Sequence, residues 1–118
     1  MKLIIAGGRD FNNEQLMRDS LQQMVADGLI DESVVLICGK ARGADMLGYR
    51  LFKEQQLPIL EYVPDWDKLG NVAGFIRNTE MGNVADLALI FWDGQSRGTK
   101  HMIDYMKRLN KPVTLVRY

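Results

Sequence analysis

The chain has 118 residues, with fifteen Lys and Arg against fifteen Asp and Glu, so its formal net charge is zero. Its 47% hydrophobic and 25% charged residues are average for a globular protein and exclude a disordered chain. A zero net charge also argues against a protein that grips long stretches of nucleic acid, because contacts to many phosphates usually require an excess of Lys and Arg. This length predicts one domain over residues 1–118.

The expected elements alternate between apolar runs and segments of helical periodicity. In chain order they are a strand at Lys2–Ala6, a helix from Asn12 or Asn13 to about Asp27, a strand at Val34–Cys38, a helix at 44–56, a strand at Ile59–Val63, a polar loop at 64–71, a helix at 72–83, a strand at Leu87–Trp92, a turn at 93–98, a helix at 99–109 and a strand at Pro112–Val116. In the first helix, the apolar residues at helical spacing are Leu16, Met17, Leu21, Met24 and Val25. Strict alternation of strands and helices predicts an α/β fold, a parallel five-stranded sheet with helices on both faces.

The amino-acid content also limits location and cofactors. The single cysteine, Cys38, cannot form an internal disulfide, so we expect a cytoplasmic protein. The apolar runs are far shorter than the roughly 20 residues of a membrane span, so no membrane partner is expected. One histidine and no paired Cys or His motif predict no metal site and no cofactor, although an oxygen-ligand Mg²⁺ site remains compatible with the sequence.

Glycine-rich loops follow three of the expected strands. In parallel sheets, ligands bind beyond the carboxyl ends of the strands, where the strand order reverses, which directs attention to the loops at 7–12, 39–45, 64–71 and 92–98. The three glycine-rich loops are Gly7-Gly-Arg-Asp-Phe11, Gly39-Lys-Ala-Arg-Gly-Ala-Asp45 and Asp93-Gly-Gln-Ser-Arg-Gly-Thr99. Each leads into a helix, so backbone N–H groups could approach an anion such as phosphate there. The alternative is that turns between strands and helices need glycine for their geometry.

These loops contain neither a Walker motif nor the Gly-x-Gly-x-x-Gly pattern of dinucleotide-binding enzymes. The sequence therefore gives no support to an ATPase or an ordinary NAD dehydrogenase.

Basic and aromatic residues near these loops are candidates for ligand binding. Arg9 and Arg42 could form forked hydrogen bonds to phosphate, or could be solvated surface residues. Arg77 lies on an expected helix and is either part of the site or a partly buried, paired arginine. Trp66, in a polar loop, could stack on a base, whereas Trp92 ends a strand and is expected to pack in the core.

Acidic residues and the single histidine each have a functional and a structural interpretation. Asp10 and Asp45 could accept hydrogen bonds from a ribose or a base, or could cap helices. Asp93 could bind ribose or Mg²⁺, or could shape the turn before Gly94. His101, in the first turn of the last helix, could act as an acid or base, or be solvated.

Several motifs together resemble a known family over essentially the whole chain. They are Gly7-Gly-Arg-Asp-Phe11, Gly39-Lys-Ala-Arg-Gly-Ala-Asp45, Arg77-Asn78-x-x-Met81, Ala85-Asp86 and Phe91-Trp-Asp-Gly-x-Ser-x-Gly-Thr99. This combination resembles the YspA/YpsA-related branch of the SLOG superfamily, which unites the DNA-processing protein DprA/Smf with the LOG phosphoribohydrolases. The resemblance implies a Rossmann-like three-layer sandwich with a pocket for a nucleotide or nucleotide-derived ligand.

The resemblance also assigns roles to particular positions. With the loops above it implies these ligand-binding residues: Gly7, Gly8, Arg9, Asp10, Gly39, Arg42, Gly43, Asp45, Trp66, Asn78, Gly94, Ser96, Gly98 and Thr99. The catalytic candidates are Arg77, Asp93 and His101, and Arg77 lies where LOG enzymes carry an arginine that helps to cleave the N-glycosidic bond.

One departure from the LOG pattern leaves enzymatic activity open. LOG enzymes carry a catalytic glutamate shortly after Gly-Thr, but here Thr99 is followed by Lys100-His101-Met102-Ile103. Cleavage of a glycosidic bond typically needs such a carboxylate, and Asp10, Asp45, Asp93 or His101 could substitute for it.

Three hypotheses follow for the function. The first is a binder of a nucleotide-derived small molecule that hydrolyses an N-glycosidic or phosphate-ester bond if it is an enzyme. The second is a non-catalytic sensor or sequestering module for nucleotide signals in bacterial–phage conflict. The third and weakest is DprA-like binding of single-stranded DNA, because the expected binding edge mixes basic and acidic residues. By analogy with SLOG domains, a homo-oligomer is also compatible with the sequence.

Overall fold

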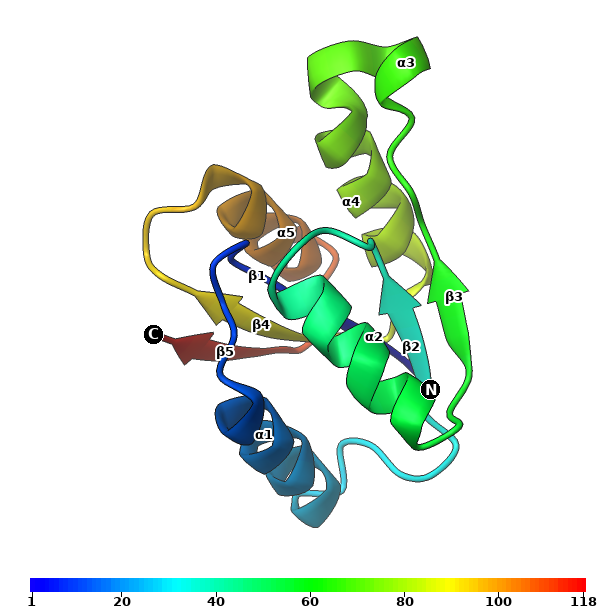
Figure 1. Cartoon of the computed structure of the whole chain (residues 1–118), viewed down its shortest axis with the longest axis vertical. Helices are drawn as coiled ribbons and strands as arrows, with labels where there is room; N and C mark the ends of the chain where they lie inside the picture. Colours follow the sequence, from blue (N-terminus) through cyan, green and yellow to red (C-terminus); the bar gives the residue numbers. More distant parts are fainter.

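The computed structural model describes all residues, 1–118, and contains one five-stranded parallel sheet flanked by helices (Figure 1). Its elements are β1 (Lys2–Gly7), α1 (Glu14–Ala26), β2 (Val35–Cys38), α2 (Ala44–Glu54), β3 (Ile59–Glu61), α3 (Trp66–Leu69), a 3₁₀ turn η1 (Gly70–Val72), α4 (Ala73–Val84), β4 (Leu87–Trp92), α5 (Arg97–Arg108) and β5 (Val113–Arg117). The strand order is β3-β2-β1-β4-β5, and all neighbouring strands are parallel. The predicted α/β class and Rossmann-like arrangement are therefore confirmed.

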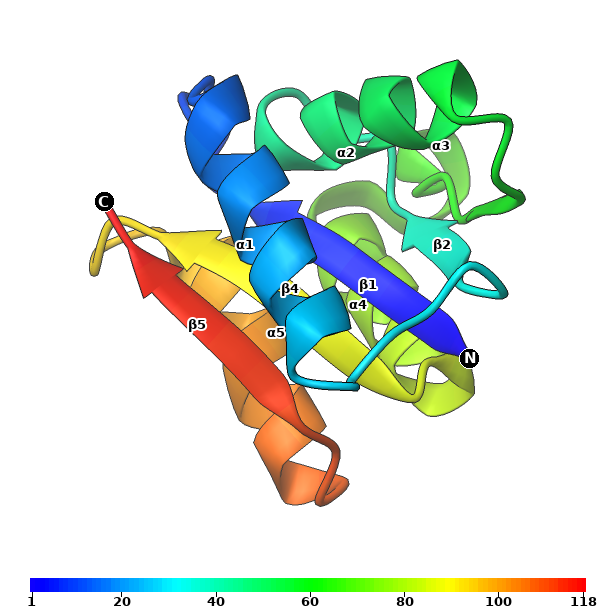
Figure 2. The same cartoon turned by 90° about the horizontal axis from the view of Figure 1, so that it is seen from below.

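The sheet separates two buried cores. Helices α1 and α2 cover one face of the sheet, and α4 and α5 cover the other (Figure 2). Because side chains alternate along a strand, Leu3 and Ile5 of β1 pack toward α1 and α2, while Ile4 and Ala6 pack toward α4 and α5. This explains why the central strands are apolar throughout their length.

Some boundaries differ from those expected. The predicted loop at 64–71 instead contains α3, whose first turn is capped by the Asp65 carboxylate at 3.1 Å from the Lys68 N–H. Helix α5 begins at Arg97, two residues before the expected start, because Ser96 is its N-cap. Val25 was expected to face the core with the other apolar residues of α1, but it is 55% exposed.

The strand order creates a crevice between the ends of β1 and β4. These strands pair directly, and the Gly8 N–H donates to the Phe91 carbonyl at 3.1 Å. Beyond that point the chain continues from β1 to α1 on one face and from β4 to α5 on the other. The two loops diverge, as at the ligand-binding edge of other parallel sheets.

Helix α3 and the first turns of α4 extend beyond the sheet at the end of the molecule where the crevice lies (Figure 1). Trp66 of α3 thereby reaches the edge of the crevice, where it lines a cavity. None of the helices has the length and apolar character required to cross a lipid bilayer.

Candidate functional site

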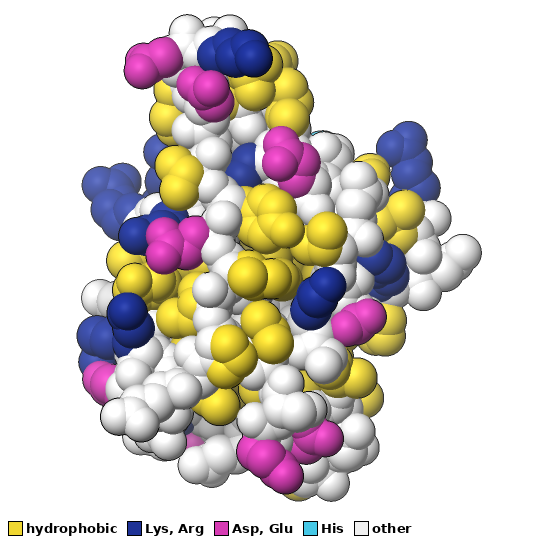
Figure 3. Space-filling view, turned by 90° about the vertical axis from the view of Figure 1, so that its right-hand side faces the viewer, with side chains coloured by type: hydrophobic (Ala, Val, Ile, Leu, Met, Phe, Trp, Pro, Cys, Tyr) yellow, Lys and Arg dark blue, Asp and Glu magenta, His cyan; other side chains and the backbone are white.

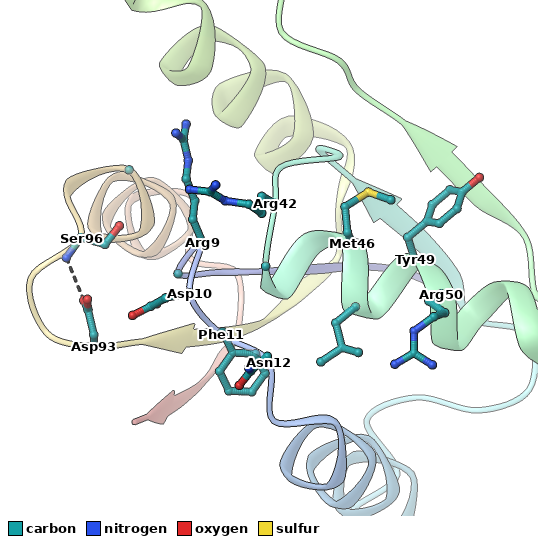
Figure 4. Close-up of a pocket in the computed structure, with 14 residues that line it drawn as sticks. Arg9, Asp10, Phe11, Asn12, Arg42, Met46, Tyr49, Arg50, Asp93 and Ser96 are labelled. Atoms are coloured by element: carbon teal, nitrogen blue, oxygen red, sulfur yellow. Dashed lines mark hydrogen bonds between the residues drawn. The ribbon is translucent and has the colours of Figure 1, made fainter.

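Two cavities meet at the crevice between β1 and β4. The smaller cavity, of about 230 Å³, lies between the end of β1, helix α4 and the start of α5 and is partly open to solvent. It is called the enclosed cavity below because it is less open than the groove. The open groove, of about 1160 Å³, runs from Asp93 and Ser96 along the β1–α1 loop to α2 (Figure 4). Both cavities are lined by Arg9, Ser96 and Gly98, so these residues form the junction between them.

Three arginines surround this junction. Arg9 lines both cavities, Arg42 lines the groove, and Arg77 lines the enclosed cavity. All three also line a third depression of about 390 Å³ next to Lys40, and in the view of Figure 4 the Arg42 side chain points toward that of Arg9. None of them belongs to any of the six ion pairs of the structure. The crevice therefore offers three guanidinium groups outside ion pairs, which favours an anionic ligand, while the acids Asp10, Asp45 and Asp93 line the same two cavities.

Arg77 is held in place by neighbouring polar groups. Its Nη1 donates to the Gly39 carbonyl at 2.5 Å, and its Nε donates to the Asn78 side-chain oxygen at 3.0 Å. A Cβ atom on Gly39 would lie 2.9 Å from both the Arg77 guanidinium carbon and Asp45 Oδ2. Gly39, predicted to let a ligand approach the backbone, thus provides the space that Arg77 occupies.

Asp45 is the buried acid of the enclosed cavity. It lies in the first turn of α2, is 4% exposed, and accepts a hydrogen bond from the Ala41 N–H at 3.5 Å. Burial raises the pKa of Asp45 to about 6, and the positive charge of Arg77 opposes that rise. Acids with shifted pKa values inside cavities are characteristic of functional sites.

Asn78 connects α4 to the start of α5. Its side-chain nitrogen donates to the Gly98 carbonyl at 3.2 Å and lies 3.3 Å from Nδ1 of His101. Burial lowers the pKa of His101, which favours the neutral ring and lets Nδ1 accept that hydrogen bond. His101 lines neither cavity and contacts the side chain of Asn78, which lines the enclosed cavity.

Asp93 lies on the groove side of the junction. Its Oδ1 accepts hydrogen bonds from the backbone N–H groups of Gln95 at 2.8 Å and Ser96 at 2.9 Å, and these bonds lower the pKa of Asp93. The Ser96 bond is drawn in Figure 4. The structure therefore does not bring Arg77, Asp93 and His101 together around one point, and their catalytic roles stay predictions.

The β1–α1 and β2–α2 loops pack directly against each other. The Ala44 N–H donates to the Gly8 carbonyl at 3.2 Å, and Gly43 has a φ of +87°, which favours glycine. Tyr118 Oη donates to Asp10 Oδ1 at 2.6 Å, next to Gly8. Gly8 and Gly43 thus allow close packing of the two loops, whereas a Cβ on Gly98 would project into open space.

The remaining predicted residues also lie at this edge of the sheet. Trp66 is 50% exposed and lines the enclosed cavity with Gly7 and Thr99. Trp92 is not in either cavity: its indole N–H donates to the Ser96 carbonyl at 3.1 Å, and the Arg117 guanidinium lies 5.1 Å from its ring. Gly94, with a φ of +88°, shapes the turn beside Arg117.

Several residues that line the cavities carried no signal in the sequence. Met46 and Tyr49 line the groove, and Gly74 and Phe75 line the enclosed cavity. Each lies on a helix where its residue type is equally typical of packing, so only the fold reveals its position.

Comparisons with known proteins agree with this architecture. The model of the YspA, cpYpsA-related SLOG family matches residues 1–69. The chain is also 31% identical over 120 residues to the Gene 61 protein of Mycobacterium phage D29, an alignment that covers 95% of this chain and 93% of that protein. No solved structure matches the chain significantly.

Proposed function

The chain belongs to the YspA, cpYpsA-related SLOG family, and on this premise we propose that it binds a nucleotide or nucleotide-derived small molecule in the crevice between β1 and β4. The observation that carries the proposal is the convergence of Arg9, Arg42 and Arg77 on one junction. None of them belongs to an ion pair, and the charge of Arg77 acts on the buried Asp45 carboxylate. Phosphate oxygens would accept hydrogen bonds from Arg9, Arg42 and the first two N–H groups of α5, because the Thr99 and Lys100 N–H groups already donate to Ser96.

The enclosed cavity fits the other parts of such a ligand. Trp66 and Phe75 offer aromatic faces for a base, and aromatic faces stack on any nucleobase. Asp45 and Asn78 are buried polar side chains that can orient ribose hydroxyls by hydrogen bonding.

Binding is tested by calorimetric titration with AMP, GMP, CMP and UMP. Arg9→Gln and Arg42→Gln are each expected to weaken the affinity for the nucleotide that binds by roughly tenfold or more, because a hydrogen bond to a charged group contributes about 1.5–3 kcal/mol. Arg108→Gln, which changes an exposed arginine in the last turn of α5, is the matched control and should leave the affinity unchanged. Equal affinity in all four proteins, or no binding of any nucleotide, would contradict the proposal.

The buried acid also supports a hydrolytic activity. Asp45 and Arg77 line the same enclosed cavity, and Asp45 has a pKa of about 6, suited to proton transfer near neutral pH. Asp45 thus offers the carboxylate that the sequence lacks after Thr99. In this proposal Asp45 accepts a proton from the attacking water, and Arg77 stabilises negative charge on the leaving group.

Turnover separates this activity from the sensor hypothesis. Each nucleotide that binds is incubated with the protein for several hours, and products are identified by mass spectrometry. An enzyme yields free base or free phosphate. Asp45→Asn, whose amide can still form a hydrogen bond to the ribose, abolishes the product even at a nucleotide concentration that saturates the variant. Bound nucleotide without product would support a non-catalytic sensor or sequestering module.

A further inference from the structure

The two cavities differ in the space that they offer, which bears on the size of the ligand. Cavities for drug-sized ligands have volumes of about 300–1,000 Å³. The enclosed cavity, at about 230 Å³, is below that range and has room for one part of a nucleotide, with the rest of the molecule extending through its open side. The groove, at about 1160 Å³, is long enough to receive a second group.

The groups shared by the two cavities are the ones that suit an anion. Arg9 contributes a guanidinium without a carboxylate partner, Ser96 a hydroxyl group, and Gly98 the backbone of the first turn of α5. A linking phosphate group at this junction would leave its two substituents pointing in different directions, one into each cavity.

The far part of the groove offers no free positive charge. Arg50, which lines it, is paired with Glu14 and with Glu54, the latter at 3.0 Å. The floor is formed by Phe11, Met46 and Leu47, which are apolar. A chain of further phosphates would find no partner there, whereas an uncharged ring would contact the apolar floor.

We infer that the crevice binds a two-ended ligand, a diphosphate held at Arg9, Ser96 and Gly98 with a nucleoside in the enclosed cavity and an uncharged group in the groove. This inference rests on the proposed nucleotide binding and specifies its ligand class. The base stacks on Trp66, and the second group, a sugar or a second nucleoside, lies over Met46.

Calorimetric titration with AMP, ADP, ATP and ADP-glucose, and with the corresponding uridine series, tests the inference. For the base that binds, the nucleoside diphosphate glucose should bind at least tenfold more tightly than the diphosphate, because only it fills the groove. The triphosphate should bind no more tightly than the diphosphate.

Two variants locate the ends of the ligand. Met46→Trp fills the groove and should reduce the affinity for the diphosphate glucose to that of the diphosphate, while the affinity for the monophosphate stays the same. Gly74→Leu fills the enclosed cavity and should weaken all of these ligands by at least tenfold. Thermal unfolding of each variant shows whether the fold is retained, and ADP-glucose titration of Leu47→Trp provides a second groove variant if Met46→Trp does not fold.

The outcomes separate the two proposals. If diphosphate and diphosphate glucose bind equally well and Met46→Trp has no effect, the two-ended ligand is wrong while nucleotide binding stands. If no member of either series binds and neither GMP nor CMP binds, nucleotide binding itself is overturned.

Discussion

At the scale of single residues, Asp45 is a buried carboxyl group whose ionised form is costly to the fold. A carboxyl group that is 4% exposed and whose pKa is raised to about 6 loses solvation when it ionises, and the charge of Arg77 compensates only in part. The model value for aspartate is 3.8, so the folded chain binds this proton more tightly than the unfolded chain does. The contribution of Asp45 to stability is therefore fully present below about pH 4 and is lost as the pH rises through about 6.

Asp45→Asn should accordingly stabilise the protein near neutral pH. The amide stays uncharged at every pH, so we expect the free energy of unfolding at about pH 7.5 to rise by on the order of 2 kcal/mol, with the difference vanishing near pH 4. Urea denaturation of both proteins at both pH values measures this difference in the free energy of unfolding. Asp67→Asn, at an exposed position of α3, should give no pH-dependent difference. A variant less stable than the parent at both pH values would show that ionised Asp45 stabilises the fold.

Gly39→Ala tests whether Gly39 acts through Arg77. The new methyl group would lie close to both the Arg77 guanidinium and Asp45 Oδ2. Because the guanidinium is the flexible end of a long side chain and can move away, the fold should survive with a loss of stability below about 1 kcal/mol. The affinity for nucleotide should fall by about tenfold or more, as measured by calorimetry.

The double variant supplies the control for this prediction. If the methyl group acts only by moving Arg77, Gly39→Ala combined with Arg77→Gln should bind nucleotide no more weakly than Arg77→Gln alone. Additive losses would mean that Gly39 contributes to the ligand site independently of Arg77.

At the scale of elements, the structure shows which of two residues, Asn12 or Asn13, is the N-cap of α1. The Asn13 side-chain oxygen accepts a hydrogen bond from the Leu16 N–H at 3.0 Å, and Asn12 has no such bond. Asn13→Ala should therefore lower the free energy of unfolding by about 1 kcal/mol, whereas Asn12→Ala should leave it nearly unchanged. Thermal and urea unfolding of the two neighbouring variants measure this difference. Equal losses would place the cap elsewhere.

The elements that could be predicted are those whose signal is local. Four of the five strands are short apolar runs bounded by Gly, Pro, Asn or Asp, and their order along the chain sets the α/β class. Helix α3 escaped prediction because a single turn, Trp66–Leu69, has no periodicity and depends on one capping residue, Asp65. Val25 matched the apolar spacing of α1, but it follows the buried Met24 and is therefore turned by about 100° from it around the helix, so its side chain is exposed.

The clustering of the candidate site residues at one edge of the sheet was predictable from the sequence, and their individual contacts were less so. The glycine-rich loops do lie together at the carboxyl edge of the sheet, and Arg9, Arg42 and Arg77 surround one junction. The role of Gly39 depends on a contact with a residue 38 positions away. The contact between Asp10 and Tyr118 spans 108 positions. Such contacts leave no mark in the local sequence.

At the scale of the whole molecule, the net charge of the chain is zero, whereas the arginines of the crevice act only over the short distance across that site. Figure 3 shows lysine, arginine, aspartate and glutamate side chains interspersed over one face, with no extended region of one sign. Arg9, Arg42 and Arg77, which belong to no ion pair, are instead gathered around cavities at one edge of the sheet. A charge distribution of this kind attracts a small anion but offers no track for a polyanion.

The salt dependence of binding tests this distinction. A protein that contacts 6–10 phosphates of a nucleic acid loses about 10³–10⁵ in affinity between 50 and 200 mM salt. Here the affinity for a nucleotide should fall by less than roughly tenfold over that range, because a small ligand carries few charges and no condensed counterions. Fluorescence anisotropy with labelled oligothymidylate should detect no binding at about 150 mM salt. Tight binding of the oligonucleotide that weakens steeply with salt, and that Arg9→Gln and Arg42→Gln abolish, would instead make the crevice part of a single-stranded DNA interface.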